Sequence, residues 1–69
     1  MTKEQLEVLH KAYLTGFTLQ SNFAREHAQI VGVLASMGLI STKEGDSTFG
    51  NTWRTTFAGL LKLTEKGIV

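Results

Sequence analysis

The chain has 69 residues with no cysteine and no proline, and its formal net charge is +1. A length this small predicts a single domain over residues 1–69. The lack of cysteine excludes disulfides and thiolate metal sites and is consistent with a reducing cytoplasm. With 42% apolar residues, but no run near the ~20 residues of a membrane span, we expect an ordered domain that does not cross a membrane.

The first predicted helix begins after Thr2 and ends near Gly16. Thr2 and Gln5 have the spacing of a capping box, in which each side chain satisfies a backbone N–H of the other residue. Gly16 is a typical helix stop, and we expect Phe17 to fold back onto the helix. Apolar residues recur between these ends at helical spacing, namely Leu6, Leu9, Ala12 and Tyr13.

A second helical pattern follows a polar stretch rich in capping residues. Ser21 or Asn22 is positioned to cap it. The helical pattern itself runs from residue 23 to residue 37, and Gly38 is the expected stop.

Two short strands and a last helix complete the chain. We expect a strand over residues 39–43, a turn-rich loop over 44–51 and a return strand over 52–57. Alternation on the return strand directs Trp53 toward the core, together with Thr55 and Phe57. Thr56 is positioned to cap a final helix over about residues 57–66.

This order of elements predicts an α+β fold. We expect a small winged helix-turn-helix-like domain with two to three helices, a β-hairpin wing and a C-terminal helix. In such domains the helix before the hairpin commonly enters the major groove of DNA. Only about twenty residues separate the first helix from the wing. The middle helix is therefore either a single turn near residues 19–25 or merged with the recognition helix, and we favour a short turn over 18–23 that leads into one longer helix.

Arg25, His27 and Gln29 lie near the start of this long helix and form the first candidate DNA-binding group. Arginine and glutamine match the hydrogen-bonding patterns of base edges, and residues early in a recognition helix reach the bases. A solvated helix face explains the same residues equally well. Glu26 lies among them and would repel phosphate.

Lys43 and Arg54 lie on the two arms of the predicted hairpin and form the second group. Facing the same region, they could hold a phosphate or an acidic surface of RNA polymerase. They could equally be edge-strand charges that prevent aggregation. The loop between them carries Glu44 and Asp46, which argues against deep insertion into a minor groove, and Phe49 there is either a contact residue or an anchor of the loop.

Gly32 interrupts the long helix and forms a strip of small residues with Ala28 and Ser36. Such a strip lets the backbone of DNA or a partner approach, or it packs closely against another helix of the same chain. We favour packing within the chain.

Catalytic and metal-binding patterns are missing from the sequence. His10 and His27 are isolated, and no carboxylate cluster accompanies them. No nucleophile–histidine–acid grouping or phosphate-binding glycine motif occurs. We therefore expect neither enzymatic activity nor a cofactor.

A set of residues across the middle of the chain resembles the small DNA-binding host-transcription-shutoff proteins of T7-like phages. The resemblance spans about residues 18–59, and the chain departs from the family pattern at Thr55, in the wing loop and at the C-terminus. The matching residues are Gln20, Ser21, Asn22, Phe23, Arg25, Ala35, Ser36, Gly38, Ile40, Ser41, Gly50, Trp53, Thr56 and Gly59.

The resemblance implies a phage-encoded protein that acts in the cytoplasm of the infected bacterium. It would inhibit host RNA polymerase by binding promoter DNA, the polymerase, or a sigma factor bound to it. Arg25 is the functional residue that the resemblance supports best. Gln20, Ser21 and Asn22 also match, although helix capping explains them too.

The sequence leaves two kinds of partner open. One is duplex DNA, bound by a local basic face. The other is bacterial RNA polymerase or a sigma factor, bound by a protein-interaction module with little DNA affinity of its own. The net charge of +1 favours the second, because non-specific DNA binders usually carry a strong positive charge. We expect a monomer or a weak homodimer.

Overall fold

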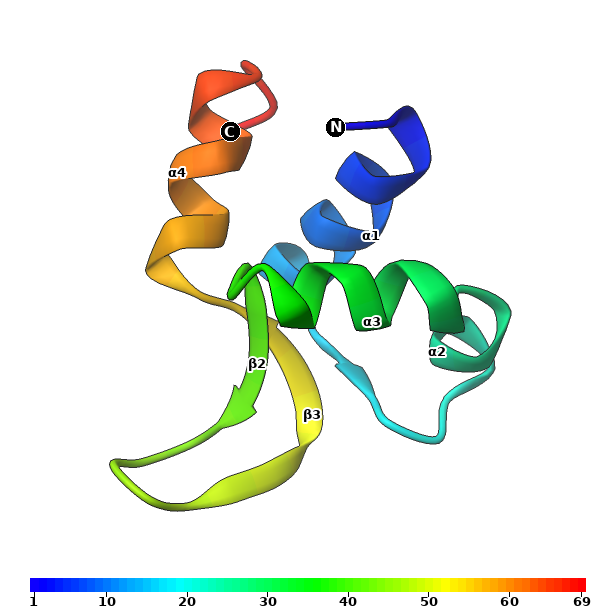
Figure 1. Ribbon diagram of the computed structural model, residues 1–69, viewed down its shortest axis with the longest axis vertical. Helices are drawn as coiled ribbons and strands as arrows, with labels where there is room; N and C mark the ends of the chain where they lie inside the picture. Colours follow the sequence, from blue (N-terminus) through cyan, green and yellow to red (C-terminus); the bar gives the residue numbers. More distant parts are fainter.

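The computed structural model covers residues 1–69 and contains four helices and one three-stranded antiparallel sheet, so the predicted α+β class is confirmed (Figure 1). The wing, formed by β2, β3 and the loop between them, projects from one end of the molecule, and both termini lie toward the other end. In chain order the elements are α1 (Lys3–Leu14), β1 (Phe17–Thr18), α2 (Asn22–Glu26), α3 (Ala28–Ser36), β2 (Ile40–Lys43), β3 (Phe49–Thr55) and α4 (Phe57–Glu65).

The predicted caps begin the first and last helices. The Thr2 hydroxyl accepts a hydrogen bond from the Gln5 backbone at 3.1 Å, and the Gln5 side chain accepts one from the Thr2 backbone at 3.0 Å. The Thr56 hydroxyl accepts a hydrogen bond from the Gly59 backbone at 3.1 Å. Both caps satisfy N–H groups that have no partner inside the helix.

Glycines end α1 and α3, as predicted. Gly16 has φ +71° and Gly38 has φ +74°, a region that residues with a Cβ rarely adopt. After Gly38, the Leu39 N–H donates to the Leu34 carbonyl oxygen at 3.0 Å, a bond typical of a glycine-terminated helix.

The sheet contains a strand that the sequence did not predict. Its order is β1-β3-β2, so β3 is central. Phe17 of β1 pairs with Trp53, and Ile40 of β2 pairs with Thr55. The predicted two-stranded hairpin therefore supplies two of the three strands of a sheet that also ties the end of α1 to the wing.

The predicted bounds of the hairpin are partly wrong. β3 begins at Phe49, inside the expected loop, and ends at Thr55. Phe57 belongs to α4 and is exposed, so it does not share a strand face with Trp53. The loop is shorter than expected because the Thr48 carbonyl oxygen accepts hydrogen bonds from the Glu44 and Gly45 N–H groups and closes the turn early.

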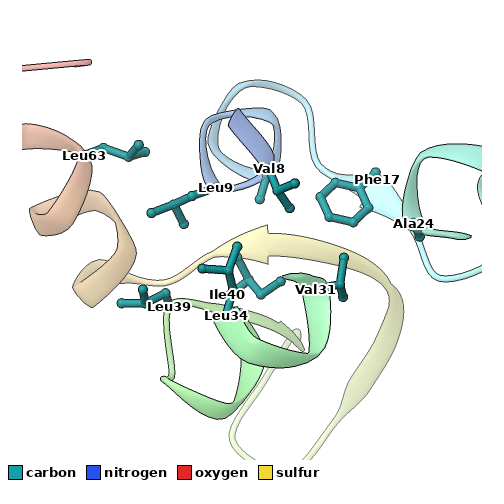
Figure 2. Close-up of a cluster of buried hydrophobic side chains, with 10 residues drawn as sticks. Val8, Leu9, Phe17, Ala24, Val31, Leu34, Leu39, Ile40 and Leu63 are labelled. Atoms are coloured by element: carbon teal, nitrogen blue, oxygen red, sulfur yellow. The ribbon is translucent and has the colours of Figure 1, made fainter. Parts of the chain in front are cut away.

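The core lies between α1, α3, α4 and the sheet (Figure 2). It contains no buried polar or charged side chain. Trp53 is partly buried and packs against it, which confirms its predicted core position. The ten buried residues are Val8, Leu9, Ala12, Phe17, Ala24, Val31, Leu34, Leu39, Ile40 and Leu63.

None of the helices combines the length and the apolar character needed to cross a membrane.

Candidate nucleic-acid interface

The predicted long helix is two helices, which changes where the candidate residues lie. α2 ends at Glu26, α3 begins at Ala28, and His27 between them has φ −116° and ψ +27°, outside helical geometry. Tertiary contacts favour this break, because α2 packs against β1 while α3 packs against α1. Arg25 is therefore on α2 and Gln29 on α3, so the predicted single face that joins them along one helix is wrong.

Ser21, Gln20 and Asn22 lie at the start of α2, and only Ser21 is used locally. Its hydroxyl accepts a hydrogen bond from the Ala24 N–H at 3.1 Å and donates one to the Thr18 carbonyl oxygen at 2.8 Å. Ser21 is thus the N-cap of α2. The Gln20 and Asn22 side chains are exposed and available to a partner.

His27 is held by contacts within the chain. Its Nδ1 lies 3.1 Å from the Glu4 carboxylate, and its ring centroid is 4.5 Å from that of Phe23. Phe23 in turn packs edge-on against Phe17 at 4.9 Å. The His27 side chain is only 22% exposed. These contacts fix the junction between α2 and α3, and they make His27 a positioning residue for its neighbours.

A shallow depression at this junction brings three predicted residues together. It has a volume of about 270 Å³, and Arg25 and Gln29 line it from the two sides of His27. Two carboxylates also line it, so the depression is not a purely basic site. The complete lining is Glu4, Arg25, Glu26, His27, Ala28, Gln29 and Ile30.

The exposed side of α3 carries no charge. We define the α3 face as Gln29, Gly32, Val33 and Ser36, which are all exposed. The buried residues Val31 and Leu34 lie on the opposite side of the helix. A helix surface of this kind can approach a groove or a partner closely, but it cannot itself neutralise phosphate.

Gly32 does not pack within the chain, so the favoured prediction for it is wrong. A Cβ placed on Gly32 would have nothing within 4 Å. No neighbouring helix covers this part of α3. The close approach that a glycine permits here is open to an external partner.

Lys43 lies on β2 and Arg54 on β3, the two arms of the wing, as predicted. Lys43 pairs with Phe49 near the tip of the wing, whereas Arg54 pairs with Ser41 near its base. Along β2 only two residue steps, or roughly 7 Å, separate Lys43 from Ser41. β3 advances by five residues (54 to 49) over the same span, so its extra residues form a bulge.

The Arg54 side chain extends toward the turn after α1. Its guanidinium nitrogen would lie 3.5 Å from a Cβ placed on Gly16. Neither Arg54 nor Lys43 forms an ion pair with a carboxylate. Both charges are thus exposed and unpaired.

A second depression lies beside the start of α2. It has a volume of about 370 Å³ and is lined by Thr18, Leu19, Gln20 and Asn51. The Leu19 N–H donates to the Asn51 carbonyl oxygen at 2.8 Å, which joins this turn to β3. Gln20 is therefore a neighbour of the wing and is separate from the Arg25 depression.

Phe49 is an exposed residue of the wing. Its side chain is 67% exposed and does not anchor the loop. Glu44 extends across the hairpin, and its carboxylate fills the space where a Cβ on Gly50 would stand. The end of the wing therefore combines an exposed aromatic ring with acidic side chains.

Three participants in these sites could not be predicted from the sequence. Glu4 contacts His27 from 23 positions away, and no local pattern indicates that contact. Thr18 and Asn51 line the second depression because β1 pairs with β3. The only available signal was the alternation of Phe17 and Thr18, which is too short to identify a strand.

Comparison with known proteins adds no further information. No protein-family model, no curated protein and no solved structure matches the chain. No three His, Asp or Glu side chains are grouped so as to hold a metal ion.

Proposed function

We propose that this chain is a small winged-helix DNA-binding domain that helps to inhibit bacterial transcription. In this proposal α3 enters the major groove and Arg25, Lys43 and Arg54 contact phosphates. The single observation that carries the proposal is the exposed, uncharged α3 face beside the exposed cation Arg25.

The order of the elements supports the winged-helix interpretation. Two helices with a sharp break at His27 precede a projecting hairpin, and a short strand after α1 joins the same sheet. In helix-turn-helix proteins the second helix reads the major groove while the first crosses the DNA backbone. α3 and α2 correspond to these two helices, with the wing beside them (Figure 1).

Gln29 is the residue best suited to read a base. It is exposed in the first turn of α3, the part of a recognition helix that reaches base edges. Glutamine can form two hydrogen bonds with adenine, and Val33 could contact a thymine methyl group. Gly32 lies between them and leaves the backbone of α3 free to approach the groove.

The number of phosphate contacts sets the expected salt dependence of DNA binding. Three phosphate contacts predict a slope of about −2.7 for the logarithm of the binding constant against the logarithm of salt concentration. Fluorescence anisotropy of a labelled duplex, repeated over a series of salt concentrations, measures that slope. Arg25→Ala or Arg54→Ala should each reduce its magnitude by about 0.9.

Lys66→Ala is the matched control, because it removes one exposed positive charge just after α4, away from the proposed interface. We expect it to leave the slope unchanged. If the Arg25 and Arg54 variants bind like the parent protein, the assigned face is wrong. Equal losses in all three variants would indicate a response to total charge alone.

The second candidate function is binding to RNA polymerase or a sigma factor, with little affinity for DNA. The observation that favours it is the end of the wing, where exposed Phe49 lies near Glu44 and Asp46. Aromatic side chains are frequent anchors of protein interfaces, and these carboxylates would be repelled by phosphate. Retention of polymerase from a nuclease-treated lysate, without any shift of purified DNA in a gel, would replace the DNA proposal with this one.

A further inference from the structure

α4 exposes two large apolar side chains on one face. Phe57 is 75% exposed and Leu61 is 50% exposed. They are four residues apart, so they lie on the same face of the helix. The exposed residue Ala58 lies beside them, and the buried residues Gly59 and Leu63 face the core.

The end of α3 extends this apolar surface. The Thr56 hydroxyl donates a hydrogen bond to the Gly38 carbonyl oxygen at 2.7 Å, which holds the end of α3 against the start of α4. Met37, the residue before Gly38, is 53% exposed. We define the α4 patch as Met37, Phe57, Ala58 and Leu61.

We propose that the α4 patch is the interface of a homodimer, in which a second copy of the chain covers it. The exposed area of the α4 patch is the first observation that favours a second copy of the chain as the partner. The exposed parts of its three large side chains amount to about 300 Å². Two copies contribute about 600 Å², and at the roughly 65% apolar content of homodimer interfaces this supports about 900 Å² of total buried area, which is typical of weak interfaces. Such a dimer is weak and forms as concentration rises.

The charges around the patch also suit an identical partner. The patch itself carries no charge. On the same helix, Lys62 and Glu65 pair with each other at 3.5 Å. The rim is therefore close to neutral, and two copies can approach without repulsion. With the two α4 helices antiparallel about a two-fold axis, Phe57 of one copy packs against Leu61 of the other.

The dimer proposal does not rest on the proposed DNA function, although Met37 of the patch directly follows Ser36 of the α3 face. α2 and the first turn of α3 lie away from α4 (Figure 1) and stay exposed in the dimer. The test therefore needs no DNA, and its outcome does not depend on whether the chain binds DNA.

Sedimentation equilibrium of the full chain, over about 10 µM to 1 mM, tests the proposal at the concentrations where a weak dimer forms. We expect the average mass to rise toward twice that of the monomer. Leu61→Gln should weaken the dimer at least tenfold. Leu14→Gln is the matched control, since Leu14 is a helical leucine on α1 that is 61% exposed, against 50% for Leu61, and its replacement should change nothing. A monomer at every concentration, or a dimer that Leu61→Gln does not weaken, overturns the proposal.

Cysteine crosslinking gives a second readout that does not depend on affinity. The chain has no cysteine of its own, so a single introduced thiol reports only on its own position. Ala58→Cys keeps the large side chains of the patch and should yield a disulfide-linked dimer on mild oxidation. Leu14→Cys should not. Equal crosslinking of both variants would indicate random collision and would contradict the assigned face.

Discussion

Gly32 lies in the middle of α3, exposed, with open space where a Cβ would stand. A glycine in a helix costs roughly 0.5–1 kcal/mol relative to alanine, because more backbone freedom is lost on folding. No contact inside the chain compensates for that cost. A partner that approaches the backbone of α3 closely does compensate for it, and this connects Gly32 to the proposed binding face.

The substitution Gly32→Ala separates stability from binding. We expect the free energy of unfolding to rise by about 0.5–1 kcal/mol, since the added methyl group meets nothing and alanine favours a helix. DNA affinity should fall, because the methyl group holds α3 away from the groove. Urea unfolding and anisotropy on the same preparation measure the two effects. A variant that is both more stable and binds equally well would show that close approach at Gly32 is unnecessary.

Local side-chain chemistry was predictable from the sequence, and contacts between distant residues were not. Thr2, Ser21 and Thr56 cap their helices through hydrogen bonds that span three residues, so the sequence alone indicates them. The contact between His27 and Glu4 spans 23 residues and depends on how α1 packs. The placement of His27 as a positioning residue therefore had to come from the fold.

At the scale of elements, α4 approaches the sheet very closely at one residue, Gly59. Gly59, in its first turn, is buried, and a Cβ there would overlap the Leu39 carbonyl oxygen and the Thr55 hydroxyl. The Leu39 carbonyl oxygen belongs to the backbone just before β2, and it cannot move aside as a flexible side chain can. Only glycine lets α4 pack this closely against the strands.

Gly59→Ala should therefore destabilise the protein, by at least about 2 kcal/mol, because the methyl group overpacks a buried junction. The change in the free energy of unfolding has the opposite sign to that of Gly32→Ala, although both substitutions replace a glycine by alanine inside a helix. The midpoint of urea unfolding distinguishes them directly. Unchanged stability in the Gly59 variant would mean that α4 is not packed as described.

The elements that the sequence did not predict correctly depend on tertiary contacts. β1 has only two residues and exists because Phe17 and Thr18 pair with β3. The break between α2 and α3 occurs at His27 without any glycine or proline to indicate it. A helical pattern that continues across residues 23–37 cannot reveal a change of direction that packing imposes.

For DNA binding by the whole molecule, the positions of the charged residues matter more than the net charge. The net charge is +1, the α3 face is uncharged, and Arg25, Lys43 and Arg54 are exposed on other elements. The α+β class and the order of helix, hairpin and helix followed from the sequence. The register shift in the wing did not, because it has no signature in the residues themselves.

The small size of the chain also limits the stability of the whole molecule. Only 11 of the 69 residues are buried, and a domain this small buries a modest share of its unfolded surface. Self-association through the α4 patch would add stability that grows with the logarithm of concentration. The proposed dimer is thus consistent with a core that consists of ten apolar residues.

The central claim is that α3 and its neighbouring cations bind duplex DNA. An NMR titration of the labelled protein with a short duplex at low salt tests it most directly, because amide shifts map the bound surface residue by residue. We predict the largest shifts at Arg25, Gln29, Gly32 and Ser36, with Lys66 unchanged. No shifts at saturating DNA, or shifts confined to α4, would contradict it.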